Sequence, residues 1–206
     1  MLSSGYKKFK YFTNGVSYRD PLLKIRNLKK IVFDEKFIKL MSYLIGGDIK
    51  LGPLKMATYF NNKLPKNCIN YFHSDHLTAD GKKMSKCLKV SISLNTGGKI
   101  GGEYMHIAKR KSKLKFNKQY FEKKLMTPEL KDCLVIPKLS LGDVVVFDPT
   151  NFYHAAAKPK NKRNMLYLEY TSKNNKNVPF PTNIFKTDYK KLSKLQKKLA
   201  SSFIKS

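Results

Sequence analysis

The sequence has few cysteines and no long apolar run. Its three cysteines, Cys68, Cys87 and Cys133, are odd in number and include no close CxxC pair, which argues against a disulfide scaffold and against a cysteine-ligated zinc site. No stretch approaches the roughly 18 uninterrupted apolar residues that a membrane span requires, and the N-terminus lacks the apolar middle of a secretory signal. We therefore expect a soluble, cytoplasmic protein with reduced thiols.

Acidic residues and arginines are also scarce. The chain has 42 lysines and arginines against 14 aspartates and glutamates, so its formal net charge is +28. Lysine accounts for nearly all of this charge, and lysine is the poorer residue for bidentate recognition of bases and phosphates. The lysines are spread along the whole chain, which favours a solvated surface. Nucleic acid, another acidic partner or an anionic membrane surface stays the alternative reason for the charge.

A helix is predicted near the N-terminus of a single domain. The 206 residues, 41% of them hydrophobic, are enough to bury one sizeable core. Asp34 can cap a helix over about 34–46, and Gly46 and Gly47 are its stop signal. The apolar residues that recur at three- and four-residue steps in this helix are Phe37, Leu40, Met41 and Leu44.

The middle of the chain, about 54–171, has the pattern of an antiparallel β protein. Its apolar runs are short, rich in β-branched and aromatic residues, and separated by Pro, Gly, Asn and Asp clusters. Many short strands with turn signals predict a sandwich or barrel and not a parallel α/β sheet. The first of these runs is 54–60, and the clearest predicted strands are 69–75, 86–94, 103–109, 133–138, 143–149, 152–157 and 164–171.

A basic helix is predicted at the C-terminus, over 186–206. It follows the Asn- and Pro-rich stretch 172–183, and Thr187 or Asp188 could cap it. We favour packing of this helix against the domain, and docking on a membrane surface or a partner is the alternative. Residues 1–185 would then be the domain. The apolar side of the helix would consist of Leu192, Leu195, Leu199 and Phe203.

Histidine is scarce, and two of the four histidines lie in the stretch YFHSDHL, residues 71–77. Side chains alternate along an extended strand, so His73 and Asp75 project from one face and His76 from the other. An imidazole beside a carboxylate offers two ligands to a divalent metal. A chain of this composition can contain HxD by chance, so the motif alone is a weak signal and a polar turn is the structural alternative.

A third ligand is available in His154. It follows the Gly142-Asp143 turn and the apolar run 144–147, and Arg163 comes shortly after it at the start of another predicted strand. Two histidines and one carboxylate on neighbouring strands form the facial triad that holds iron(II) with positions left open. A nearby arginine suits the carboxylate of an anionic co-substrate.

With these residues in this order, the chain resembles the iron(II)/2-oxoglutarate-dependent oxygenases, and most closely their phytanoyl-CoA hydroxylase-like branch. That family has HxD, a distal histidine roughly 80 to 90 residues later, and an arginine about ten residues after that. The sequence matches the pattern with His73, Asp75, His154 and Arg163. The segment 89–113 resembles the family's central strand-turn-strand only loosely.

The resemblance implies a fold and a metal site. The fold would be a cupin-like double-stranded β-helix, in which two antiparallel sheets form a jelly roll with flanking helices. Iron(II) would be held in its open mouth by His73, Asp75 and His154. Halogenating relatives carry a small residue in place of the carboxylate, so Asp75 favours hydroxylation.

The resemblance also implies the co-substrates, 2-oxoglutarate and O2. The far carboxylate of 2-oxoglutarate would pair with Arg163, and Tyr59 and Asn61 are further candidates for contact with it. Its oxidative decarboxylation would release succinate and CO2 during hydroxylation of the prime substrate. Tyr104 and His106 share strand parity and are the candidates for substrate contact, although a structural role for His106 is the alternative.

We expect a small-molecule or metabolite-like substrate. Two other interpretations stay open. The same chemistry could act on nucleic acid or on a protein side chain, although the alkyl-lesion demethylases usually have two arginines where this chain has Arg163. A non-enzymatic basic jelly-roll binding module is the third interpretation. No sequence feature specifies an oligomeric state.

Overall fold

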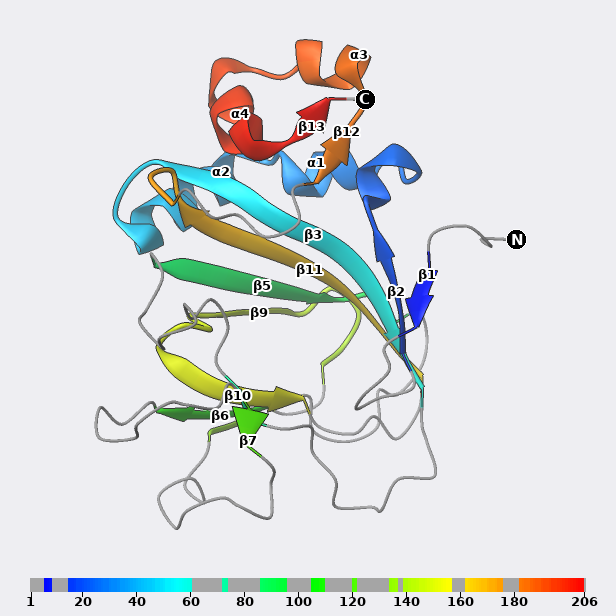
Figure 1. Cartoon of the computed structure of the whole chain (residues 1–206), viewed down its shortest axis with the longest axis vertical. Helices are drawn as coiled ribbons and strands as arrows, with labels where there is room; N and C mark the ends of the chain where they lie inside the picture. Colours follow the sequence, from blue (N-terminus) through cyan, green and yellow to red (C-terminus); the bar gives the residue numbers. More distant parts are fainter. Residues whose placement is uncertain are drawn as a thin grey trace.

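The computed structural model describes residues 6–8, 15–60, 72–73, 86–95, 105–109, 120–121, 134–136, 139–156, 162–175 and 182–205. These residues form two antiparallel sheets, with helices against the larger sheet (Figure 1). The predicted mainly β architecture with flanking helices is therefore confirmed. In this part of the chain, no helix has the length and apolar character needed to cross a membrane.

The larger sheet is six-stranded and antiparallel throughout. Its register shifts between Leu168 and Tyr170, opposite Gly52 and Pro53, because proline has no N–H to give to the ladder and such residues are accommodated in bulges. In spatial order its strands are β1 (Tyr6–Lys8), β2 (Gly15–Arg19), β3 (Ile49–Tyr59), β11 (Arg163–Ser172), β5 (Cys87–Ser93) and β9 (Val144–Phe147).

The smaller sheet is five-stranded and also antiparallel. Its strands, in spatial order, are β7 (Tyr120–Phe121), β4 (Phe72–His73), β10 (Phe152–Ala156), β6 (Met105–Lys109) and β8 (Leu134–Ile136). The chain passes back and forth between the sheets, because β3, β5, β9 and β11 belong to the larger one and β4, β6, β8 and β10 to the smaller. A separate parallel pair joins β12 (Asn183–Ile184) to β13 (Ile204–Lys205).

Each predicted strand has a counterpart among these strands. β3 begins at Ile49, earlier than predicted, and of the predicted strand 69–75 the structure describes only β4. β1, β2 and β7 were not predicted, because each is short and lacks a run of alternating apolar residues.

The helices are η1 (Pro21–Leu23), α1 (Leu28–Val32), α2 (Glu35–Ile45), α3 (Lys186–Lys190), α4 (Lys194–Leu199) and η4 (Ala200–Ser202). α2 begins and ends as predicted. The Asp34 carboxylate accepts a hydrogen bond from the Phe37 N–H at 2.7 Å, and Gly46 takes the left-handed conformation, with φ of 87°, that ends the helix.

The buried face of α2 differs from the predicted stripe. Ile38, Met41 and Ile45 are buried, whereas Leu40 and Leu44 are 49% and 40% exposed. Most residues of this helix are apolar, so the three- and four-residue spacing fits more than one face and does not single out the buried one.

The C-terminal segment forms the short helices α3, α4 and η4 and the strand β13 where one helix over 186–206 was predicted. The cause is a second helix start at Ser193, whose hydroxyl accepts from the Gln196 N–H while the Gln196 side chain accepts from the Ser193 N–H. Leu199 and Phe203 are buried in the same core as α2. The expected packing of this segment against the rest of the chain is therefore confirmed.

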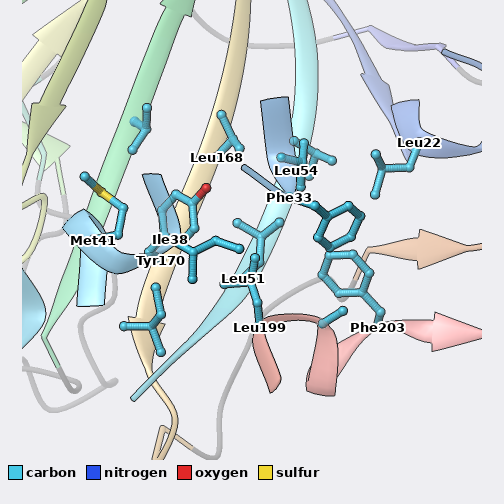
Figure 2. Close-up of a cluster of buried hydrophobic side chains, with 14 of the residues drawn as sticks. Leu22, Phe33, Ile38, Met41, Leu51, Leu54, Leu168, Tyr170, Leu199 and Phe203 are labelled. Carbon is cyan, nitrogen blue, oxygen red and sulfur yellow. The ribbon is translucent and has the colours of Figure 1, made fainter. Parts of the chain in front are cut away.

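Two apolar clusters lie on opposite faces of the larger sheet. The outer core joins this sheet to the helices and includes Leu51, Leu54, Leu168, Leu199 and Phe203 (Figure 2). The inner cluster joins the two sheets. Because side chains alternate along a strand, β11 places Leu166 and Leu168 in the outer core and Met165 and Tyr167 in the inner cluster. The buried members of the inner cluster are Ala57, Met105, Ile107, Leu139, Phe147, Met165 and Tyr167.

Candidate functional site

His154 reaches the space between the sheets through a tight turn from β9 to β10. The Asp148 carboxylate holds this turn by accepting from the N–H groups of Thr150 and Asn151, at 2.8 and 3.0 Å. The turn carries the chain from the larger sheet to the smaller one. His154 is 4% exposed, and its ring centroid lies 4.9 Å from that of Phe147, at an interplanar angle of 64°.

The strand register places position 73 beside His154. In β10 and β4, His154 is directly opposite His73, and on its other side it is opposite Ile107 of β6. Directly opposite positions in antiparallel strands share a face of the sheet, with Cβ atoms about 4.5–5.5 Å apart. Ile107 belongs to the inner cluster. The structure therefore brings two of the three predicted ligand positions together on the inner face of the smaller sheet.

The remaining parts of the predicted metal site lie outside what the structure describes. This applies to the side chain of His73 and to Asp75 as a whole. Within the described ranges, no group of three or more His, Cys, Asp or Glu residues is arranged to hold a metal ion. The part of the donor set that can be placed, a buried imidazole opposite a second histidine position, suits a borderline divalent metal such as iron(II).

Arg163 lies on the facing sheet, as the first residue of β11. Its side chain is fully buried, and its guanidinium carbon lies 5.2 Å from the ring centroid of Tyr59, which is directly opposite in β3. At this distance the cation is attracted to the face of the ring. Tyr59 and Arg163, each a candidate for contact with 2-oxoglutarate, are thus adjacent. Asn61 lies outside the described residues.

Asn95 fixes the start of β11, a role that was not predicted. Its side-chain oxygen accepts from the Asn164 N–H at 2.6 Å, and its side-chain nitrogen donates to the Lys162 carbonyl at 2.8 Å. The two bonds hold the main chain on both sides of Arg163. An asparagine at the end of the predicted strand 86–94 was the only available signal.

A line of aromatic and cationic groups continues along the inner face of the larger sheet. The rings of Tyr59 and Tyr167 meet edge to face, with centroids 6.4 Å apart at 84°. The Lys55 ammonium lies 5.3 Å from the Tyr167 ring centroid. Arg163 lies at one end of this line and Lys55 at the other, and the fully buried Arg163 guanidinium is the group suited to an anionic ligand.

Two serines of β5 complete the inner face. Ser91 and Ser93 are 0% and 1% exposed and lie directly opposite Tyr167 and Met165. Their hydroxyls have no hydrogen-bond partner among the described residues. A buried hydroxyl without a partner costs free energy, so the place it faces is suited to a polar group. The available sequence signal was serine at alternate positions of the apolar strand VSISL.

His106, a predicted substrate contact, is not brought to His154. In β6 it is opposite Ala155, one position away from the pair of Ile107 and His154, so it lies on the other face of the smaller sheet. Tyr104 and His76 lie outside the described residues. Asp143 has a structural role in the turn predicted at Gly142-Asp143, because its carboxylate accepts from the Ser140 N–H at 2.6 Å before β9.

Comparison with known proteins relates the chain to others through its fold. No family model and no curated protein sequence matches it. Solved structures do match, and one is the epimerase SnoN in complex with Fe3+, alpha ketoglutarate and nogalamycin RO. That match has a TM-score of 0.56 and 13% identity, and covers 82% of this chain and 69% of SnoN. The chain shares its fold.

Two further structures with this fold are similar to the chain. EctD from S. alaskensis, solved with 2-oxoglutarate and 5-hydroxyectoine, has a TM-score of 0.57 and 15% identity, over 78% of this chain and 57% of EctD. AviO1 from Streptomyces viridochromogenes Tue57 has a TM-score of 0.54 and 16% identity, over 87% of this chain and 78% of AviO1. SnoN is a non-heme alpha-ketoglutarate-dependent epimerase, and EctD has also been solved with bound Fe.

Proposed function

We propose that this protein is an iron(II)- and 2-oxoglutarate-dependent oxygenase with a double-stranded β-helix fold. The observation that carries the proposal is the register that sets His154 opposite His73 on one sheet, while Arg163 is buried on the facing sheet beside the same inner cluster. An imidazole pair for a metal and a buried guanidinium for a carboxylate are the two protein parts that this chemistry needs. The fold shared with SnoN and EctD supports it.

In this proposal His73, Asp75 and His154 would hold the iron. Bound iron(II) would supply the activation of O2, coupled to the oxidative decarboxylation of 2-oxoglutarate to succinate and CO2. The chain itself fixes the ligand geometry. The Asp148 turn sets the position of His154, and the Phe147 ring packs against the imidazole, limiting its rotation and the access of water.

Arg163 would bind the far carboxylate of 2-oxoglutarate by a charge-assisted pair. Tyr59 holds the guanidinium from one side, and Asn95 holds the main chain next to it. The hydroxyls of Ser91 and Ser93 would donate to the same bound acid, which would satisfy two buried groups that have no partner among the described residues. Asn61, two positions after Tyr59 in the sequence, stays a prediction for this pocket.

The prime substrate would be a small molecule, and hydroxylation the reaction. SnoN and EctD were solved with nogalamycin RO and 5-hydroxyectoine, both small molecules, which supports this substrate class. The order of His73, Asp75, His154 and Arg163 supports the phytanoyl-CoA hydroxylase-like branch. Tyr104 stays a candidate for substrate contact, whereas the register gives no support to His106.

The test is succinate formation by the purified full chain with iron(II), 2-oxoglutarate and O2. A panel of metabolites, lipids, peptides and oligonucleotides is added in turn, and any stimulated sample is analysed by mass for an added oxygen. We expect succinate formation that requires both iron and 2-oxoglutarate and is stimulated by a small molecule. The proposal is overturned if folded wild-type protein forms no more succinate than the His154→Ala variant under every condition. Stimulation by oligonucleotides or peptides alone would keep the chemistry and overturn the substrate class.

A further inference from the structure

α2 is apolar on two sides. Its inward side, Ile38, Met41 and Ile45, packs into the outer core. On its outward side, Leu40 is 49% exposed, Tyr43 82% and Leu44 40%. One exposed leucine would be ordinary, since folded proteins expose many apolar atoms. Here three large side chains at positions i, i+3 and i+4 of one helix are adjacent on its surface. We call Leu40, Tyr43 and Leu44 the outward stripe.

The proposed iron site does not account for the outward stripe. α2 contacts β3, β5 and β11 through the outer core, which is on the opposite face of the larger sheet from the inner cluster. Figure 1 shows α2 and the smaller sheet on opposite sides of the larger sheet. The stripe is also not the part of the helix that packs into the outer core, because Ile38, Met41 and Ile45 do so, and Asp34 and Gly46 fix the helix ends. These three exposed side chains are therefore available for contact with a partner.

The surroundings of the stripe are cationic. Lys36 and Lys39 are exposed one turn before Leu40 and Tyr43, and the Lys86 ammonium donates to the Leu44 carbonyl at 2.6 Å. The acidic residue of α2 is Glu35, at the opposite end of the helix from Leu44, where it accepts from the Ser193 hydroxyl. The outward side of α2 therefore presents two leucines and a tyrosine with lysines beside them. This is the composition of a helix that lies at an anionic bilayer surface.

We propose that the outward side of α2 is a docking surface for anionic lipid. The leucines would enter the boundary between headgroups and acyl chains, Tyr43 would stay at headgroup level, and Lys36 and Lys39 would extend their ammonium groups to lipid phosphates and carboxylates. A second copy of this chain is a poorer occupant of this surface, because each copy has a net charge of +28 and the two copies repel each other. Nucleic acid is also a poorer occupant, because its phosphate backbone offers no apolar surface to Leu40 and Leu44 of the outward stripe.

The experiment is cosedimentation of the full chain with lipid vesicles. One set of vesicles contains phosphatidylcholine alone, and the other contains phosphatidylcholine mixed with phosphatidylserine. We expect binding to the mixed vesicles at low salt, little binding to the neutral ones, and release near 1 M salt, where the Debye length falls to about 3 Å. Absence of binding to the mixed vesicles at low salt overturns the proposal, as does equal binding to both sets.

Two pairs of variants locate the surface. The triple variant Leu40→Ser, Tyr43→Ser, Leu44→Ser should lower the vesicle partition coefficient at least about tenfold, because it removes the inserted apolar groups. Leu141→Ser changes a residue that is 59% exposed in the turn before β9, and it should have no effect. Thermal unfolding verifies that each variant is folded. Unchanged partitioning of the folded triple variant overturns the proposal.

The second pair of variants distinguishes the effect of the lysines beside the outward stripe from the effect of the protein's net charge. Lys36→Gln with Lys39→Gln should weaken vesicle binding several-fold more than Lys190→Gln with Lys191→Gln, although both pairs remove the same charge. Equal effects would show that binding follows net charge alone and would overturn docking through α2. Preferential binding of duplex DNA over mixed vesicles, insensitive to the triple variant, would likewise overturn it. Wild-type succinate formation without vesicles is independent of these results, so this proposal and the proposed oxygenase activity can fail separately.

Discussion

The two faces of the larger sheet have opposite chemistry although they are built from the same strands. Toward the helices, β3, β5 and β11 contribute Leu54, Val90 and Leu168, which are buried among other aliphatic and aromatic side chains. Toward the smaller sheet the same strands contribute Tyr59, Ser93 and Arg163. Alternation of side chains along a strand lets one element serve stability on one face and ligand binding on the other.

The polar groups on the inner face lower the stability of the folded state. This face holds a buried guanidinium and two buried hydroxyls, groups that lose favourable hydration when they are removed from water. The outer core has to provide the stability that offsets this cost. It also fixes the position of β11, and therefore of Arg163, because Leu166 and Leu168 anchor this strand to the helices. Substitutions on the two faces should therefore have separable effects.

The largest effect is expected from His154→Ala. Loss of this imidazole leaves the proposed iron site with two of its three ligands, so iron-dependent succinate formation should fall to background. Equilibrium dialysis with iron(II) should show loss of tight binding, and far-UV circular dichroism should stay that of the wild type. An active, iron-binding variant would remove His154 from the ligand set.

On the other face, Leu168→Ala should lower the free energy of unfolding by about 2–5 kcal/mol, because the side chain is fully buried in the outer core and its loss leaves a cavity. Urea denaturation measures the change. At a temperature where the variant is fully folded, its affinity for 2-oxoglutarate should match the wild type. A large loss of affinity would show that the two faces are not separable.

Arg163→Met should weaken 2-oxoglutarate binding by about 10- to 100-fold, since it removes one charge-assisted pair while roughly keeping the side-chain length. Iron binding should persist. The matched control is Lys162→Met, which removes the same charge from an exposed neighbouring residue. Calorimetric titration of the iron-loaded proteins gives the three affinities, and equal values for both variants would show that Arg163 acts only through general charge.

The smallest effect is expected from Tyr170→Phe. Burial, and secondarily the nearby Asp34, raise the pKa of the Tyr170 hydroxyl, which has no hydrogen-bond partner among the described residues. At neutral pH the substitution should change the free energy of unfolding by less than about 1 kcal/mol. The unfolded state releases this proton near pH 10, and the folded state releases it only at higher pH. The free energy of unfolding therefore falls as pH rises from about 10 through the folded pKa.

Alkaline pH therefore distinguishes this variant from the wild type. Above about pH 10, urea denaturation should show that Tyr170→Phe loses less stability than the wild type. Parallel loss of stability in both proteins would mean that Tyr170 makes no contribution to the alkaline sensitivity. The comparison is made between the two proteins at each pH, so that alkaline effects common to both proteins cancel.

The sequence predicts those features that follow from local pattern. Short apolar runs and turn residues located the strands on both sides of the site, and the Asp34 cap and Gly46 located the ends of α2. His154 and Arg163 could be singled out because each follows a recognisable turn or begins a predicted strand.

What could not be predicted depends on tertiary packing. Leu40 and Leu44 have the same local spacing as buried residues, and only the docking of α2 on the sheet decides which side is covered. Ser91 and Ser93 become notable only because the strand register sets them opposite Tyr167 and Met165. His106 lies on the face of the smaller sheet opposite to that of His154, because the strand register pairs His154 with Ile107 and not with His106. No local sequence pattern encodes this register.

The most direct test of the central claim is an anaerobic titration of the iron(II)-loaded chain with 2-oxoglutarate, followed by visible absorption. If His154 and its partners hold iron on one sheet while Arg163 receives the acid from the other, a weak charge-transfer band should appear and saturate at one equivalent. Folded, iron-loaded wild-type protein that gives no band, or a band of equal affinity in Arg163→Met, would contradict the account.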